Sequence, residues 1–125
     1  MTKKAFFPGG KKSGRPYSPA VAANGFLFIS GQIPLNSEGK LVAGDIRLET
    51  RQCFENLSSV VQEAGVTLDN LVKVNIFVKD LANYDAVNSI YAEYVAGEVL
   101  PARSFVQVAD LPLGATIEIE AVAAL

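Results

Sequence analysis

The sequence of 125 residues has no histidine and a single cysteine, Cys53. Without histidine the chain cannot build a Ser-His-Asp or Cys-His nucleophile pair, a His-bearing zinc site, or a ribonuclease centre that uses histidine as acid or base. A lone cysteine cannot close an intrachain disulfide or supply a multi-cysteine metal site. Any chemistry must come from arginine, lysine, acids, hydroxyls, amides, the backbone and water.

Long apolar runs and an excess of positive charge are also missing. No run reaches the roughly 18 apolar residues of a membrane helix, and Met1-Thr2-Lys3-Lys4 is not followed by the apolar stretch of a signal peptide. The net charge of -2 disfavours a broad phosphate-binding surface. We therefore expect a cytoplasmic protein with neither a membrane nor a nucleic acid as partner.

What the sequence does have is enough apolar residues, 50%, to build the core of one domain over residues 1–125. The Gly- and Lys-rich stretch from Pro8 to Pro16 lacks the spacing of a phosphate-binding loop and is interpreted as a solvated loop.

Strands are expected at 4–7, 17–22, 26–31, 71–78, 102–108 and 116–124, with Asn24-Gly25 as a hairpin turn. Helices are expected at 46–64, ended by Gly65, and from about Ala82, capped by Asp80 or Asn83. The order βββαβαββ predicts an α+β domain with both helices on one sheet face.

The last two strands carry charged residues whose side can be predicted from strand alternation. Arg103 and Phe105 alternate with small and apolar residues, and we expect the small and apolar set to face the helices. Glu118 alternates with the apolar set of the last strand, so Arg103 and Glu118 are expected on the same outer face. A face that combines these charges with Phe77 and Phe105 is typical of a subunit interface, where a cleft could leave the charged pair available to a ligand.

Four blocks resemble a known family: Pro16-Tyr17-Ser18-Pro19-Ala20-Val21, Ile29-Ser30-Gly31-Gln32-Ile33-Pro34, Pro101-Ala102-Arg103-Ser104 and Ile117-Glu118-Ile119-Glu120-Ala121. In this order along nearly the whole chain, they resemble the Rid or YjgF family of reactive intermediate deaminases. The resemblance implies a chorismate-mutase-like fold with a mixed, mainly antiparallel six-stranded sheet. It also implies a homotrimer with clefts between subunits, and no metal or organic cofactor.

The resemblance further implies hydrolysis of 2-iminopropanoate, 2-iminobutanoate and their enamine tautomers to 2-keto acids and ammonia. Carried over position by position, the site residues are Tyr17, Ser30, Gly31, Asn88, Arg103 and Glu118. Phe105 stands where many members have cysteine, which affects pocket size and substrate range. A thiol nucleophile is not needed to hydrolyse an imine.

Each of these side chains suits a step of imine hydrolysis. The planar guanidinium of Arg103 can bind a carboxylate through two parallel hydrogen bonds, and the carboxylate of Glu118 can orient the attacking water and relay its proton. Tyr17 and Asn88 would wall the pocket, while Ser30 and Gly31 offer hydroxyl and backbone contacts.

Plainer interpretations and other functions remain open at this stage. Without the resemblance, Arg103 and Glu118 are typical of a cross-strand ion pair, and Cys53 of a buried inert thiol. Glu120 is expected to be structural or to lie at the subunit interface, and the tyrosines at helical spacing, Tyr84, Tyr91 and Tyr94, are expected to be packing residues. The alternatives to a deaminase are a non-catalytic module that binds small carboxylates and, less favoured, a ribonuclease or translation inhibitor.

Overall fold

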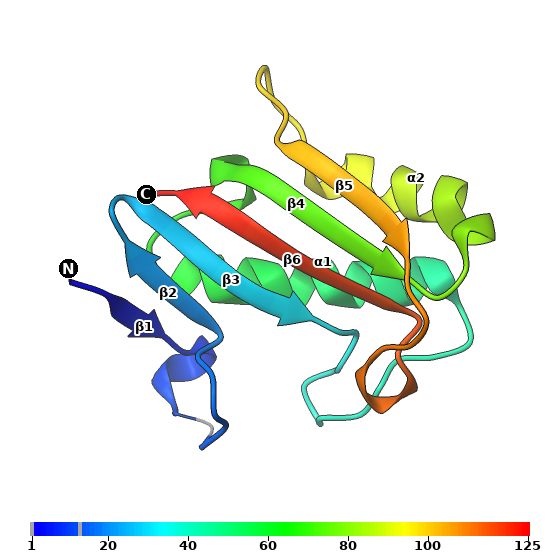
Figure 1. Ribbon diagram of the computed structural model, residues 1–125, viewed down its shortest axis with the longest axis horizontal. Coiled ribbons are helices and arrows are strands. Elements are labelled where there is room, and N and C mark those ends of the chain that lie inside the picture. The colour runs from blue at the N-terminus through cyan, green and yellow to red at the C-terminus, as the bar shows by residue number, and fades with distance from the viewer. Residues whose placement is uncertain (1, 13) are drawn as a thin grey trace.

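Figure 1 shows the computed structural model, which describes residues 2–12 and 14–125. A six-stranded sheet is backed by two helices that lie together behind one of its faces (Figure 1). The strands are β1 (Lys4–Phe6), β2 (Ala20–Ala23), β3 (Phe26–Gln32), β4 (Leu71–Val78), β5 (Ala102–Gln107) and β6 (Ile117–Ala124), and the helices are α1 (Ile46–Glu63) and α2 (Tyr84–Tyr94). The expected α+β class and βββαβαββ order are confirmed.

The strand order is β1-β2-β3-β6-β4-β5, which places β6 inside the sheet and β5 at an edge. Strands β4 and β5 run parallel, and the other neighbouring pairs are antiparallel. This is the mixed, mainly antiparallel sheet that the resemblance implies. The short 3-10 turn η1 (Pro8–Gly10) opens the expected loop at 8–16; Ser13 of that loop, like Met1, lies outside the described residues.

The hairpin and the first helix follow from their turn and cap residues. Asn24 and Gly25 have φ values of 52° and 81°, the left-handed conformation that a two-residue turn between twisted strands requires. Helix α1 begins after Asp45, whose side chain accepts the N–H groups of Arg47 and Leu48. It ends one residue before the predicted Ala64, and Gly65 follows with a φ of 79°, the usual conformation after a helix C-terminus.

The second helix is preceded by a turn that the sequence did not separate from it. The 3-10 turn η3 (Leu81–Asn83) is capped by Asp80, whose side chain accepts the N–H of Ala82. Helix α2 then starts at Tyr84, and Asn83 makes no side-chain capping hydrogen bond. Strand β4 has the bounds that the alternation predicts, whereas β2 begins at Ala20, three residues later than predicted, because Pro19 has no N–H to donate to a strand ladder.

The core lies between the two helices and the covered sheet face. The largest fully buried side chains belong to both layers: Phe54, Leu57, Val60, Val61 and Val87 from the helices, and Leu27, Val74, Ile76, Val78, Ile117 and Ile119 from the sheet. The opposite sheet face, called the open face below, carries Phe26 and Phe28, which are 43% and 50% exposed. In β6 they pair with Ala124 and Val122, which alternate with the buried Ala121 and Ala123. Phe26 and Phe28 therefore lie on the sheet face opposite the helices.

The predicted orientation of β5 is wrong. In the parallel β4–β5 ladder, Val74 pairs with Arg103 and Ile76 pairs with Phe105. Val74 and Ile76 are fully buried on the helix side, and paired residues share a face of the sheet. Arg103 and Phe105 therefore point toward α2. Val106, expected to face the helices, is 45% exposed.

Glu118 lies on the other side of the sheet. It pairs with Phe77 across β4 and alternates with the buried Ile117 and Ile119. Arg103 and Glu118 thus occupy opposite faces, and the expected shared outer face does not exist within one chain. Helix α2 presents tyrosine rings and an amide to β5, and these groups favour contact with an arginine over a small apolar side chain. The alternation within β5 does not show what the helix presents, so it could not predict the orientation of the strand.

Candidate functional site

Four of the predicted site residues line one pocket. A cavity of about 790 Å³ at the end of β3 includes Tyr17, Ser30, Gly31 and Glu118 among its lining residues. Its other walls come from the segment before β2, the loop after β3 and the polar side of α1. The sequence blocks around residues 17, 30 and 118 are therefore brought together in space, as the prediction required.

Hydrogen bonds fix the backbone around Ser30. Its Oγ donates to the carbonyl of Ser18 at 2.7 Å, and its N–H donates to the carbonyl of Pro19 at 2.9 Å. These two bonds hold the segment that carries Tyr17, whose side chain is 53% exposed and whose hydroxyl accepts a hydrogen bond from Arg15 Nη1 at 3.2 Å. Ser30 thus has a structural role in this chain, and Tyr17 presents its ring to the pocket.

Gly31 lies directly against the Glu118 side chain. A Cβ atom at this position would lie 2.7 Å from Glu118 Cδ and 2.8 Å from its Oε2, closer than real Cβ contacts allow. The β3–β6 register is shifted between Ile29 and Gln32, so the strand is irregular at the same place. Only glycine lets the carboxyl group of Glu118 rest on this backbone.

The environment of Glu118 favours its protonated form. Burial in the pocket raises the pKa of its carboxyl group, and the negative charge of Glu120 on the same sheet face raises it further. Glu120 itself accepts a hydrogen bond from Asn75 Nδ2 at 3.1 Å, which agrees with the structural role expected for it. A carboxyl group with a raised pKa can exchange protons nearer neutral pH than an ordinary glutamate.

Arg103 is held from α2 by two hydrogen bonds. Its Nη1 donates to Asn88 Oδ1 at 2.7 Å, and its Nη2 donates to the Tyr84 hydroxyl at 3.2 Å. Asn88 was predicted to belong to the site, and the structure places it in direct contact with Arg103. The cross-strand ion pair with Glu118 that Arg103 suggested without the resemblance does not form within the chain, because the two residues lie on opposite sheet faces.

Aromatic rings surround the same guanidinium. The Arg103 Cζ atom lies 4.7 Å from the ring centroid of Tyr91, 5.4 Å from that of Phe105 and 5.8 Å from that of Tyr84. The rings of Tyr84 and Phe105 also contact each other, with centroids 4.7 Å apart. Phe105 therefore forms part of a cation–π environment that attracts and orients the Arg103 charge.

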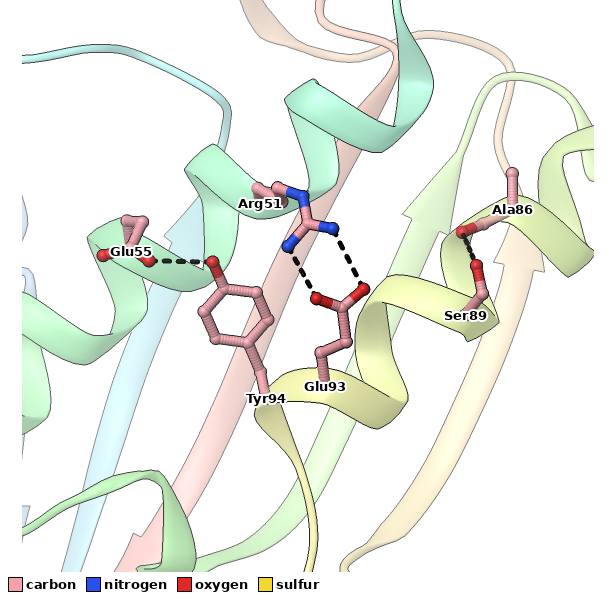
Figure 2. Close-up of polar contacts among 6 residues, drawn as sticks. All are labelled: Arg51, Glu55, Ala86, Ser89, Glu93 and Tyr94. Atoms are coloured by element: carbon pink, nitrogen blue, oxygen red, sulfur yellow. Dashed lines mark hydrogen bonds and ion pairs between the residues drawn. The ribbon is translucent and has the colours of Figure 1, made fainter.

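Helix α2 is tied to α1 on the outer side. Figure 2 shows Arg51 of α1 making two parallel hydrogen bonds to Glu93 of α2, at 2.8 and 3.0 Å, and the Tyr94 hydroxyl donating to Glu55 Oε1 at 2.8 Å. The Arg51 hydrogen bonds lower the pKa of Glu93. Because the Arg51–Glu93 pair is about half exposed, it contributes little to stability, but it helps to set where α2 lies against α1.

The comparison with known protein families identifies the chain. The family model described as Endoribonuclease L-PSP, a family also called YjgF, Rid or RutC, matches residues 11–125. The chain belongs to this family. A mouse relative named 2-iminobutanoate/2-iminopropanoate deaminase is 42% identical over 109 residues, which cover 86% of this chain and 80% of the mouse protein.

Solved structures of Rid proteins share the whole fold. The Yersinia pestis Rid-family protein YyfA is 43% identical, with a TM-score of 0.91 over 99% of this chain and 100% of that one. Escherichia coli TdcF, solved with bound serine, is 32% identical with a TM-score of 0.85 over 98% of both chains. The family and the fold that the four sequence blocks implied are confirmed.

Sequence reasoning missed two residues of this Rid chain's Arg103 cluster. Tyr84 and Tyr91 were interpreted as packing residues, although with Asn88 they are spaced four and three residues apart and so share one helix face.

Cys53 is fully buried as expected, and burial raises the pKa of its thiol. Within 2–12 and 14–125, no helix is long and apolar enough to cross a membrane, and no group of three or more His, Cys, Asp or Glu side chains could hold a metal ion.

Proposed function

We propose that this Rid-family chain hydrolyses 2-imino acids and their enamine tautomers, such as 2-iminopropanoate and 2-iminobutanoate, to 2-keto acids and ammonia. The observation that carries the proposal is the guanidinium of Arg103, fixed by Asn88 and Tyr84 with N–H groups to spare. A guanidinium has five N–H donors, so a pair remains to bind the substrate carboxylate. The mouse relative named as a deaminase of this kind supports the same reaction.

The pocket around Glu118 supplies the second half of the chemistry. In the proposed mechanism the Glu118 carboxylate accepts a proton from water as the water oxygen bonds to the carbon of the protonated imine and the C=N π electrons move to nitrogen, which gives a neutral carbinolamine. Glu118 then returns that proton to the amino nitrogen. The carbinolamine hydroxyl gives its own proton to Glu118 as the carbonyl forms, the carbon–nitrogen bond breaks and ammonia leaves. Proton relay of this kind contributes about 10²–10⁴-fold, and positioning of the substrate adds to it.

The two halves meet only if two subunits share a site. Arg103 and Glu118 lie on opposite faces of one sheet, so we propose that the protein is a homotrimer in which Arg103 of one subunit faces the Glu118 pocket of the next. The exposed Phe26 and Phe28 of the open face support a face covered by another subunit. The cytoplasm is the proposed location.

The reaction is tested with 2-iminopropanoate generated in situ from an amino acid by a separate enzyme. Keto acid and ammonia formation is compared for the native protein and Arg103→Ala. Acceleration by the native protein that disappears in the variant supports the deaminase. If the native protein accelerates none of several imino acids, the proposal fails.

The shared site is tested by mixing inactive subunits. Arg103→Ala and Glu118→Gln chains are co-expressed with different tags and purified through both. Every trimer that carries both tags contains one or two chains of each kind, and in either case one of its three sites combines an intact Arg103 with an intact Glu118, so about a third of native activity returns. Mixed trimers that stay as inactive as either parent would place both residues of a working site in one subunit.

A non-catalytic role in binding small carboxylates is the second candidate, and the serine bound to Escherichia coli TdcF favours it. Binding of 2-oxobutanoate without turnover of any imino acid would support this candidate. The family description names an endoribonuclease, but this chain has no histidine and a net charge of -2. We therefore expect no RNA cleavage, which an assay on labelled single-stranded RNA can check.

A further inference from the structure

The hydroxyl of Tyr84 contacts Arg103 in a way that limits how the guanidinium can turn. It accepts from Nη2 at 3.2 Å, while Asn88 accepts from Nη1 at 2.7 Å. Two acceptors on the two terminal nitrogens resist rotation about the Cδ–Nε and Nε–Cζ bonds, because rotation about either one would break at least one of the contacts. The plane of the guanidinium is therefore set by α2 before any ligand binds.

The ring of Tyr84 is itself held in place. It packs against Phe105 at a centroid distance of 4.7 Å, and the guanidinium lies over both of these rings and over the ring of Tyr91. Tyr84 is the residue that opens α2, next to the turn capped by Asp80. A hydroxyl on a ring with few accessible rotamers loses little entropy on binding its partner, so this contact can orient a longer and more flexible side chain.

We infer that Tyr84 is a positioning residue for the carboxylate-binding group Arg103, acting through its hydroxyl. The inference rests on the proposed function only for what Arg103 binds. Without the hydroxyl, the guanidinium keeps its charge, its ring contacts and its bond to Asn88, but it can turn away from the orientation that presents two parallel N–H groups. Carboxylate binding then weakens while the proton relay at Glu118 is untouched.

The experiment compares Tyr84→Phe, which removes only the hydroxyl, with Tyr94→Phe. Tyr94 is the matched control because it lies on the same helix and loses a comparable hydrogen bond, to Glu55. We expect Tyr84→Phe to raise KM for 2-iminopropanoate, and Kd for 2-oxobutanoate, about 3–10-fold with kcat within about twofold of native. Tyr94→Phe should leave all three values near native.

Two further measurements separate positioning from a merely structural role. NMR of the guanidinium N–H groups of Arg103, assigned by their loss in Arg103→Lys, should show restricted rotation in the native protein and in Tyr94→Phe but faster rotation in Tyr84→Phe. In an Arg103→Lys background, adding Tyr84→Phe should change KM less than about twofold, because the group on which Tyr84 acts is already gone.

The possible failures can be told apart. If the native protein hydrolyses the imine and Tyr84→Phe matches it in KM, the Tyr84 inference is overturned and the deaminase stands, whatever the NMR shows. If the native protein binds 2-oxobutanoate without turnover and Tyr84→Phe binds it more weakly, the inference stands and the deaminase fails. If the native protein neither binds nor turns over these compounds, both are overturned.

Discussion

Replacing Gly31 with alanine should damage catalysis without damaging the fold. The new Cβ would lie 2.7 Å from Glu118 Cδ, whereas ordinary contact begins at 3.4 Å, so the carboxyl group must move by at least about 0.7 Å. A misplacement of about 1 Å can cost about 10²-fold in rate, which is about 2.7 kcal/mol of transition-state stabilisation. We therefore expect kcat/KM to fall by about 10–10²-fold.

The stability of the same variant should hardly change. The φ of Gly31 is not in the left-handed region, and the atoms that must move, Cγ, Cδ and Oε2 of Glu118, belong to a flexible side chain and not to the backbone. Alanine also lowers the conformational entropy of the unfolded chain, which favours folding by about 0.4–1 kcal/mol. Thermal unfolding should therefore give a Tm within a few degrees of the native value.

A double-mutant comparison decides whether the effect passes through Glu118. Imine hydrolysis is measured for Gly31→Ala, Glu118→Gln and the double variant. If the alanine acts by displacing the carboxyl group, the double variant is no slower than Glu118→Gln alone. Full activity of Gly31→Ala beside a slow Glu118→Gln, or two losses that simply multiply, would refute the reasoning.

Three other predictions concern the site and the fold. Arg103→Lys keeps the charge but loses the two-pronged geometry, so kcat/KM should fall at least about tenfold; a near-native value would show that charge alone suffices. The acid limb of the pH profile of kcat/KM should lie above the ordinary glutamate pKa of 4.5, because burial and Glu120 raise the pKa of Glu118, which acts as a carboxylate. Glu120→Gln removes the neighbouring charge and should move the acid limb to lower pH. If the acid limb does not move, a group other than Glu118 produces it. Asp45→Ala removes the N-cap of α1 and should lower the free energy of unfolding by about 1 kcal/mol. Tm should then fall by about 4 °C at fixed protein concentration, whereas Asp45→Asn should keep most of the stability that the cap supplies.

Local signals in the sequence were sufficient for the elements and their order along the chain, whereas the mixed, mainly antiparallel sheet was implied only by the family resemblance. Asn24-Gly25 determines its turn through backbone conformations that few other pairs adopt, and Asp45 and Gly65 mark the ends of α1. The start of α2 lies two residues after the predicted Ala82, because Asp80 caps a 3-10 turn that runs directly into the helix. These features depend on neighbours in the chain, which a sequence shows directly.

The orientation of β5 depends on a partner far along the chain. Both faces of this edge strand mix polar and apolar residues, so alternation alone could not decide which face is covered. The decision lies with Tyr84, Asn88 and Tyr91 on α2, which offer acceptors and ring faces to Arg103. Their spacing along the helix was visible, but only the family resemblance, which puts Asn88 and Arg103 in one site, indicated that this helix face meets an arginine.

The separation of Arg103 from Glu118 has a chemical advantage for the proposed reaction. If both lay on one face within reach of each other, they would form an ion pair, which would occupy the N–H groups of the guanidinium and lower the pKa of the carboxyl group. With the sheet between them, Arg103 is oriented by uncharged partners, and Glu118 keeps a raised pKa beside Glu120. A substrate between subunits would then meet an arginine held by uncharged partners and a carboxyl group ready to exchange protons.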